Sequence, residues 1–425
     1  MNLHFIKTRI LGVIKGWAEY WFRRNIKISL LIIFLFGLVK ESYRQFYRQL
    51  RLMPVEWLGE NNSKGKKPLE QTELSYSFGP QNISGIQCVE EVQLPAVNLY
   101  YFENARVSVL SSSILLNNKI IIERVEGIDV IRCDYSSGHV IMHDKESALV
   151  RNMQTAHLDQ GIFLGGNGAS NYYHWMIEIL PKLQYLNEVD QCGFAGFPLL
   201  VSEDVDQIKT FRESLNYIAK DRPIAMLDRD KTYCVGKLVY INAPNNLPFN
   251  LRPNNKMRIA DFLTKPASIK FLRNRFFTNV DLPPPPAKGN HRIFFARRNE
   301  RRNYNQQEIF EIFSQRDFQK VFMEELSLKE QISLISNAEA IAGPTGAAWT
   351  NMIFCREGTK CLCWMADGYG EFSAFSNLAR VVGADMRYVT FKTDAKSVRE
   401  LYNRNYSVEA KKIRNALDTL LGTTY

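Results

Sequence analysis

The pair His174 and Glu178 has the residue types and the spacing to handle a proton. The two residues lie four positions apart in segment 171–181, whose apolar spacing predicts a helix, and a helix brings residues i and i+4 together on one face. Three roles stay open: a structural contact, two ligands of a metal ion, or a catalytic pair in which one member accepts a proton and the other orients it or holds the substrate. The metal role is the weakest, because no nearby Asp or Glu motif completes a coordination sphere.

A second group of residues is suited to bind phosphate. The apolar run 291–296 is followed by four arginines, Arg297, Arg298, Arg301 and Arg302. If that run is a strand of an open parallel sheet, its carboxyl end is the edge at which such sheets bind their ligands. A solvated charged face is the alternative interpretation.

A glycine turn strengthens the phosphate hypothesis. Residues 343–348, Gly-Pro-Thr-Gly-Ala-Ala, connect an expected strand at 338–342 to an expected helix that opens at 349–354. Such a turn leaves backbone N–H groups unpaired at a helix N-terminus and lets an anion approach closely. By itself it could be a simple connection. Combined with the arginines, it predicts the phosphate-binding half of an α/β fold.

Local sequence signals predict the helices and strands that position these residues. Ser327 and Glu330 form a capping box, which predicts a helix to about Asn337. A further strand is expected at 360–365, and the alternation of strands and helices is typical of an α/β protein. The glycine loop 165–168 precedes the helix that carries His174, Asn171 is placed to cap that helix, and Pro181 to kink or end it.

The length of the chain predicts two domains and an appendage. At 425 residues, of which 45% are hydrophobic, the chain exceeds the usual limit for one core and can support two. The proline-rich run 281–289 is expected to be a stiff extended spacer, and the domain boundary is placed near residue 250. We therefore expect an appendage at 1–60, a first domain at 61–250, and a second domain at 251–425 that ends in a helix.

The N-terminus carries most of the positive charge. Ten Lys or Arg against two acids give residues 1–51 a charge of +8, so the remaining residues supply only +2 of the total of +10. The apolar run 28–39 would span ~18 Å as a helix, well short of the ~30 Å hydrocarbon core. Its aromatic and basic borders favour a helix lying on an anionic membrane surface. A signal peptide is disfavoured, because no small-residue cleavage site follows, and nucleic-acid binding is disfavoured, because the charge borders an apolar helix.

Cysteine usage favours a reducing compartment. The seven cysteines are an odd number scattered mostly through apolar segments, a pattern typical of buried thiols. Cys361 and Cys363 alternate along an expected strand, but no second cysteine pair or histidine cluster offers a zinc site. No metal site is expected.

Four sequence blocks in order resemble glycosyltransferase family 61. They are 171–181, the segment 297–305, the dipeptide Glu330-Gln331, and 343–351, and the resemblance spans roughly residues 160–365. It implies a GT-B fold of two facing Rossmann-like domains, inversion at the anomeric carbon, and a nucleotide-sugar donor used without an obligatory metal. Thr345 departs from the family pattern, which usually has histidine there; a hydroxyl can donate to a phosphate oxygen but adds no charge.

The resemblance implies roles for the residues already singled out. It makes 61–250 the acceptor domain and 251–425 the nucleotide-sugar domain, whose last helix would return to the first domain. His174 and Glu178 would line the cleft between the domains, opposite the arginines. We favour Glu178 as the base, since a carboxylate desolvated by closure of the cleft becomes a stronger base, with His174 as orienting donor or substitute base. The expected donor-binding residues are Arg297, Arg301, Arg302, Gly343, Thr345, Gly346, Ala347 and Asn351. Asn351 is expected to bond either the donor or neighbouring backbone.

The function predicted from the sequence is therefore an inverting, metal-independent glycosyltransferase of surface or capsular polysaccharide synthesis. Its donor would be a nucleotide-sugar, with a UDP-sugar favoured, and its acceptor would be a glycan. The protein would be peripherally bound to the cytoplasmic face of the inner membrane. No separate cofactor is expected. A nucleotide-binding hydrolase and a non-catalytic, membrane-associated subunit of polysaccharide assembly remain as alternatives. The donor base, the sugar, the acceptor and the oligomeric state are not encoded in any motif.

Overall fold

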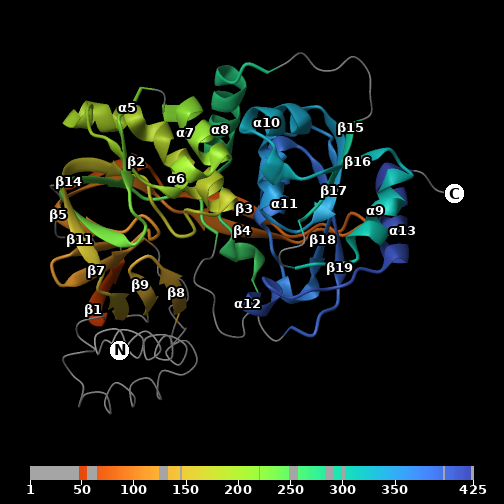
Figure 1. The fold of residues 1–425 in the computed structure, drawn as a ribbon, viewed down its shortest axis with the longest axis horizontal. Helices are drawn as coiled ribbons and strands as arrows, with labels where there is room; N and C mark the ends of the chain where they lie inside the picture. Colours follow the sequence, from red (N-terminus) through yellow and green to blue (C-terminus); the bar gives the residue numbers. More distant parts are fainter. Residues whose placement is uncertain are drawn as a thin grey trace, which may run out of the picture.

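The structure is a computed structural model that describes residues 47–54, 65–123, 133–143, 146–219, 221–247, 257–282, 291–298, 302–395 and 398–422. The expected surface helix at 28–39, most of the proline-rich run 281–289, the boundary near residue 250 and Arg301 lie outside the described residues. Within the described ranges, no helix combines the length and the apolar character that a bilayer crossing requires. The expected mixed α/β class is confirmed, with two main sheets (Figure 1).

The first sheet is mixed and runs in the order β13-β12-β11-β14-β5-β6-β7-β1-β10-β9-β8, with β2 paired to β5. Its strands are β1 (Tyr47–Pro54), β2 (Lys66–Glu70), β5 (Val97–Val107), β6 (Ile114–Leu116), β7 (Lys119–Ile122), β8 (Cys133–Ser137), β9 (Val140–His143), β10 (Ser147–Arg151), β11 (Gln154–Phe163), β12 (Leu199–Ser202), β13 (Ile224–Leu227) and β14 (Lys231–Ile241). β11 to β14 are mutually parallel, in the 3-2-1-4 order of a dinucleotide-binding half. Beyond β14 the pairing turns antiparallel at β5.

The antiparallel extension sets this sheet apart from a simple Rossmann-like sheet. It is built from strands that precede β11 in the chain, and all of its pairs are antiparallel except that of β1 with β7, which is parallel. β1 lies inside the N-terminal segment 1–60 and pairs with β7 and β10. The sheet therefore begins before residue 61.

The second sheet is parallel throughout, in the order β16-β15-β17-β18-β19. Its strands are β15 (His291–Phe295), β16 (Phe318–Val321), β17 (Ala338–Pro344), β18 (Lys360–Ala366) and β19 (Asp385–Phe391). The strands expected at 291–296, 338–342 and 360–365 are confirmed. β17 and β18 read as nearly continuous apolar runs, because helices cover both faces of the sheet.

Helices cover the second sheet on two sides. α9 (Gln306–Ser314) and α13 (Ala410–Leu421) share a core with one face. On the other face lie α10 (Leu328–Ser336), the 3-10 helix Ala347–Phe354 and α11 (Ala374–Val382). The capping box at Ser327 and Glu330 is present. The tail expected as one helix is divided into α12 (Val398–Leu401) and α13, and α13 packs beside α9 rather than crossing to the first sheet.

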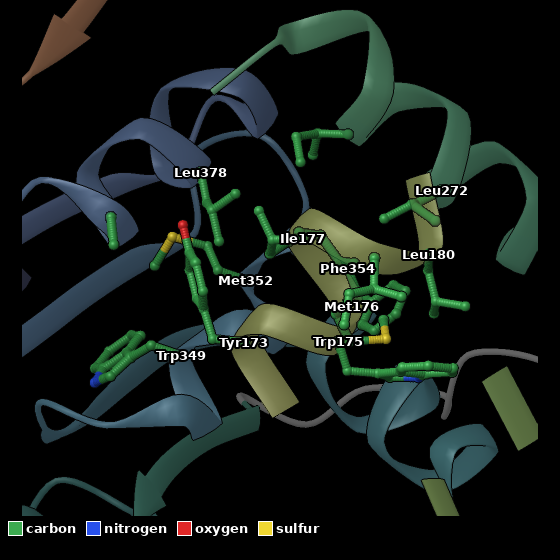
Figure 2. Close-up of a cluster of buried hydrophobic side chains, with 14 of the residues drawn as sticks. Tyr173, Trp175, Met176, Ile177, Leu180, Leu272, Trp349, Met352, Phe354 and Leu378 are labelled. Carbon is green, nitrogen blue, oxygen red and sulfur yellow. The ribbon is translucent and has the colours of Figure 1, made fainter. Parts of the chain in front are cut away.

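The two halves share one apolar core. It runs from the helical turns after Tyr172 through α8 (Pro266–Asn279) to the 3-10 helix Ala347–Phe354 and α11. Figure 2 shows Tyr173 and Met176 from the first half beside Leu272 of α8 and Met352 and Leu378 of the second. α7 (Lys209–Ala219) packs against α8 on the side of the first half. The helix that bears His174 is thus held between the halves.

A two-stranded hairpin also joins the halves. β3 (Glu73–Phe78) and β4 (Val89–Leu94) belong to the N-terminal half in sequence, yet extend to the second sheet in Figure 1. The backbone N–H of Phe78 donates to Asn377 Oδ1 at 2.7 Å. The N–H of Tyr388 in β19 donates to the carbonyl of Gln81 at 2.8 Å. The division near residue 250 is therefore crossed by backbone hydrogen bonds.

Candidate active site

His174 and Glu178 are brought into contact. Nδ1 of His174 meets Oε2 of Glu178, as the four-residue spacing predicts. The other carboxylate oxygen, Oε1, accepts a hydrogen bond from the backbone N–H of Leu247 at 2.6 Å. The side chains are only 10% and 13% exposed. Both oxygens of Glu178 are thus engaged inside the protein, and the carboxylate holds the imidazole in one orientation.

The helix around this pair is not a regular α-helix. It consists of α4 (Tyr172–His174), a π-helical turn (Trp175–Ile179), and a 3-10 helix (Leu180–Tyr185). As expected, the side chain of Asn171 caps the start by accepting the N–H of Tyr173 at 2.9 Å. A π-turn widens the helix locally and is frequent at functional sites.

Pro181 explains part of this geometry. Proline has no N–H to donate to the carbonyl four residues earlier, which here belongs to Ile177. The side-chain amide of Asn245 donates to that carbonyl instead, at 2.6 Å. Segment 245–247 therefore contacts the helix twice, at Ile177 through Asn245 and at Glu178 through Leu247. No local sequence signal indicates that this segment belongs to the site, because it lies 68 and 69 residues away from its partners along the chain.

Gly168 fixes the other side of the imidazole. Its φ is +69°, and a Cβ at this position would lie 2.5 Å from Cδ2 of His174. In the glycine loop that precedes the helix, Gly168 thus makes a close backbone contact that only glycine permits.

Arg297 and Arg302 converge on the glycine turn. The guanidinium of Arg297 donates to the carbonyl of Thr345. A Cβ on Gly346 would lie 3.0 Å from Nη2 of Arg297 and 3.9 Å from Nη2 of Arg302. Gly343 is needed for a different reason, since a Cβ there would meet Phe295 at 2.7 Å. The predicted meeting of the arginines and the turn is observed for these two arginines.

These two guanidiniums have no carboxylate partner within the described ranges. In the described part of the chain neither Arg297 nor Arg302 meets a carboxylate; Arg302 donates to the hydroxyl of Tyr369 at 3.3 Å and lies 6.0 Å from the ring centre of Tyr402. Burial lowers the pKa of Arg297, and the charge of Arg302 lowers it further, while Tyr406 acts in the opposite direction. An uncompensated pair of cations at a glycine turn favours an anionic ligand.

Arg298 points elsewhere. It forms an ion pair with Glu325, and its guanidinium lies 4.4 Å from the ring centre of Phe322. Successive residues leave a strand end in opposite directions, so the four-arginine cluster divides. Arg297 and Arg302 face the turn, Arg298 is neutralised, and Arg301 lies outside the described residues.

The remaining positions of the turn have mainly backbone roles. The N–H of Thr345 donates to the carbonyl of Trp364 at 2.9 Å, and Gly346 precedes the 3-10 helix that starts at Ala347. Asn351 accepts a hydrogen bond from the hydroxyl of Tyr172 at 2.9 Å and donates to the carbonyl of Ala348 at 3.2 Å. The Tyr172–Asn351 bond ties the histidine helix to the helix after the turn.

One family model, described as Glycosyltransferase 61, matches residues 172–362. This segment of the chain is similar to glycosyltransferase family 61. The family span begins two residues before His174 and includes Glu178, Arg297, Arg302 and the glycine turn, so both ends of the candidate site lie inside it. No curated protein matches the chain significantly.

Six cysteines are free thiols, namely Cys88, Cys192, Cys234, Cys355, Cys361 and Cys363, and the last three are buried. Burial raises the pKa of the Cys363 thiol, and contact with the Thr345 hydroxyl acts in the opposite direction. Among the residues the structure describes, no group of three or more His, Cys, Asp or Glu side chains is close enough to hold a metal ion.

Proposed function

We propose that this protein is an inverting glycosyltransferase that moves a sugar from a nucleotide-sugar donor to a glycan acceptor. The observation that carries the proposal lies within one family span: a buried histidine–carboxylate contact, together with two guanidiniums that meet no carboxylate among the residues the structure describes. Inverting transfer needs these two devices: a base for the acceptor hydroxyl and positive charge for the departing diphosphate.

The donor diphosphate would bind at Arg297, Arg302 and the turn at Gly346. Two uncompensated guanidiniums can supply the charge stabilisation that a divalent ion provides in other transferases. We therefore propose that transfer is metal-independent, with a UDP-sugar as the first donor to test. Full activity in EDTA supports this. Abolition by chelator, with rescue by manganese or magnesium, would overturn it.

The base is proposed to be His174, with Glu178 as its orienting partner. Because both oxygens of Glu178 are engaged, by Nδ1 of His174 and the N–H of Leu247, the carboxylate is better placed to orient than to accept the acceptor's proton. A proton on Nδ1 directed at Glu178 leaves the acceptor lone pair on Nε2. This reverses the roles that the sequence favoured, and it retains the same two residues.

The proposed step is a single displacement. The acceptor hydroxyl oxygen bonds to the anomeric carbon while its proton passes to Nε2 of His174. The bond from the anomeric carbon to the phosphate oxygen breaks, and its electron pair leaves with the nucleoside diphosphate, whose charge Arg297 and Arg302 stabilise. One displacement inverts the anomeric configuration.

The deciding experiment is a donor and acceptor screen read by NMR. Nucleotide-sugars that raise the melting temperature are first selected, since a ligand bound by the folded state stabilises it. Each is then incubated with glycan acceptors, and the anomeric configuration of the product is compared with that of the donor. An inverted product that His174→Ala and Arg297→Ala fail to make supports the proposal. Donor hydrolysis at an equal rate without acceptor indicates the hydrolase, and absence of all nucleotide binding indicates the assembly subunit.

We also propose that the two halves form a GT-B-like pair. The parallel second sheet, in an order typical of doubly wound folds, supports the donor half. The parallel strands β11 to β14 support an acceptor half with an antiparallel extension.

A peripheral membrane position, serving surface or capsular polysaccharide synthesis at the cytoplasmic face, remains a proposal from the sequence. Full-length protein should sediment with anionic vesicles and be only partly released by salt, because the +8 charge is screened while the apolar run 28–39 is not. The matched variant lacks residues 1–45 and so keeps β1, which starts at Tyr47. Equal sedimentation of both proteins would place the membrane contact elsewhere.

A further inference from the structure

A small cavity is bordered by Asn245 and Asn246, which directly precede Leu247, the residue whose N–H donates to Glu178. Its volume is about 170 Å³, room for about five water molecules at ~30 Å³ each. It is bordered by β2, by the start of β5, by the end of β7 and by the segment after β14. Its polar groups are four amides and two charged side chains: Asn98, Asn242, Asn245, Asn246, Lys66 and Glu123.

Asn98 is the most informative lining residue. It is only 6% exposed. Its backbone N–H donates to Asn242 Oδ1 at 2.8 Å, yet its side-chain amide has no hydrogen-bond partner among the described residues. The amide is not sealed from solvent, so water can reach it through the cavity when no ligand is bound. Because this amide borders a cavity, a ligand that accepts and donates hydrogen bonds would satisfy it.

The charges at the cavity are balanced. The ammonium of Lys66 lies 6.0 Å from the ring centre of Tyr100 and meets no carboxylate in the ranges the structure describes. Glu123 accepts the N–H of Ala243 through Oε1, and the same oxygen lies 3.8 Å from the ammonium of Lys182. One positive and one negative group beside amides suit a neutral molecule rich in hydroxyls, whereas the two guanidiniums at Gly346 suit an anion.

One short segment, 245–247, both lines the cavity and holds the carboxylate of Glu178. Asn245 and Asn246 line the cavity, and the next residue, Leu247, donates to Glu178. Consecutive Cα atoms are only ~3.8 Å apart. Asn245 also donates to the carbonyl of Ile177, one residue before Glu178. A group bound in the cavity is therefore held by the same short segment that holds the carboxylate.

We propose that this cavity is a subsite for one neutral sugar ring of the acceptor glycan. The proposal rests on the proposed transferase function and adds to it the place and chemistry of acceptor binding. Asn98, Lys66 and Glu123 would bond hydroxyls of the ring, and the segment 245–247 would set its position relative to His174 and Glu178.

The test uses full-length protein, a panel of neutral methyl glycosides as probes, and UDP as a probe of the donor end. Saturation-transfer NMR detects glycoside binding, and calorimetry measures UDP binding. Asn98→Leu removes the amide at similar size and should weaken glycoside binding about 10-fold or more, with UDP affinity unchanged. With an active acceptor, KM for the acceptor should rise by the same factor while kcat stays within about twofold.

A matched pair of surface variants keeps the test decisive if Asn98→Leu does not fold. Lys66→Gln should weaken glycoside binding, and Lys67→Gln, on the opposite face of β2, should not. Equal glycoside binding by wild type, Asn98→Leu and Lys66→Gln would overturn the subsite, as would failure of every neutral glycoside to bind wild type while UDP binds. Glycoside binding that depends on Asn98, without any nucleotide binding, would retain the sugar site and overturn the transferase.

Discussion

The carboxylate of Glu178 has both of its oxygens bound inside the protein, whereas the guanidiniums of Arg297 and Arg302 meet no carboxylate in the part of the chain that is described. At Glu178 the hydrogen bonds of the carboxylate are already formed without a ligand, and they hold the imidazole of His174 in one position. At Arg297 and Arg302 the positive charge is not balanced by any described carboxylate, which favours binding of an anion. One site can therefore be preorganised at its proton-transfer end and unsatisfied at its binding end.

The largest effect should come from the histidine–carboxylate pair. His174→Ala should lower transfer about 100- to 10,000-fold and leave UDP affinity unchanged, because the arginines are intact. Glu178→Gln should be of similar severity, because its amide would face Nδ1 and favour the wrong tautomer. The double variant should be no worse than the worse single variant, since the two residues act as one unit.

Chemical rescue assigns the roles within the pair. Added imidazole should restore part of the activity of His174→Ala if an imidazole is the base. An inactive His174→Ala that imidazole cannot rescue, together with strictly additive losses, would return the base role to Glu178.

The next effect tests how tightly the imidazole is held. In Gly168→Ala the new Cβ would collide with the imidazole, and a displacement of about 1 Å can cost about 100-fold in rate. Gly193→Ala is the control, because Gly193 also has positive φ but a Cβ added there would meet no atom within 4 Å. Steady-state transfer rates, with melting temperatures of both variants, separate displacement from loss of folding. Equal rates in the two variants would contradict a preorganised pair.

A smaller effect is expected from the arginines. Arg297→Ala and Arg302→Ala should each weaken UDP binding about 10- to 100-fold, since hydrogen bonds to charged groups contribute about 1.5–3 kcal/mol. Arg298→Ala should bind UDP as wild type does, because Arg298 is paired with Glu325. Calorimetry measures all three. A loss in Arg298→Ala as large as in the other two would mean that the cluster acts only through its net charge.

The smallest effect should come from the Thr345 side chain. The residue engages its neighbours mainly through its backbone, by its N–H to Trp364 and its carbonyl to Arg297. Thr345→Val removes only the hydroxyl and should weaken UDP binding about 2- to 10-fold, in the range of a single neutral hydrogen bond. A loss as large as that of Arg297→Ala would show that the hydroxyl takes over the task that histidine performs in the family pattern.

Local signals in the sequence predicted several helices and strands and the contact between His174 and Glu178. The four-residue spacing predicted the contact of His174 with Glu178, and the capping box predicted the start of α10. Contacts between distant segments were not predictable in this way. Nothing near Leu247 indicates that its N–H meets Glu178, because that contact depends on how the segment after β14 packs on the helix.

The directions of side chains at the end of a strand were also not predictable from the sequence. Four arginines after one strand look equivalent in sequence, but Arg298 leaves the strand on the side of Glu325, and Arg302 adopts a positive φ of 54°. Such choices depend on tertiary neighbours. The division of the first sheet into parallel and antiparallel parts has the same origin, since pairing partners of short strands are set by the whole sheet.

The hairpin β3–β4 gives the molecule a property that neither half has alone. It covers the outer edge of the parallel sheet, where Gln81 bonds β19 and Asn377 bonds Phe78, so the C-terminal half made by itself would expose an open strand edge. Cutting the chain between residues 282 and 291 should therefore yield two fragments that stay associated through purification. Expressed separately, they should behave as a split protein, each poorly soluble by itself and restored by the other.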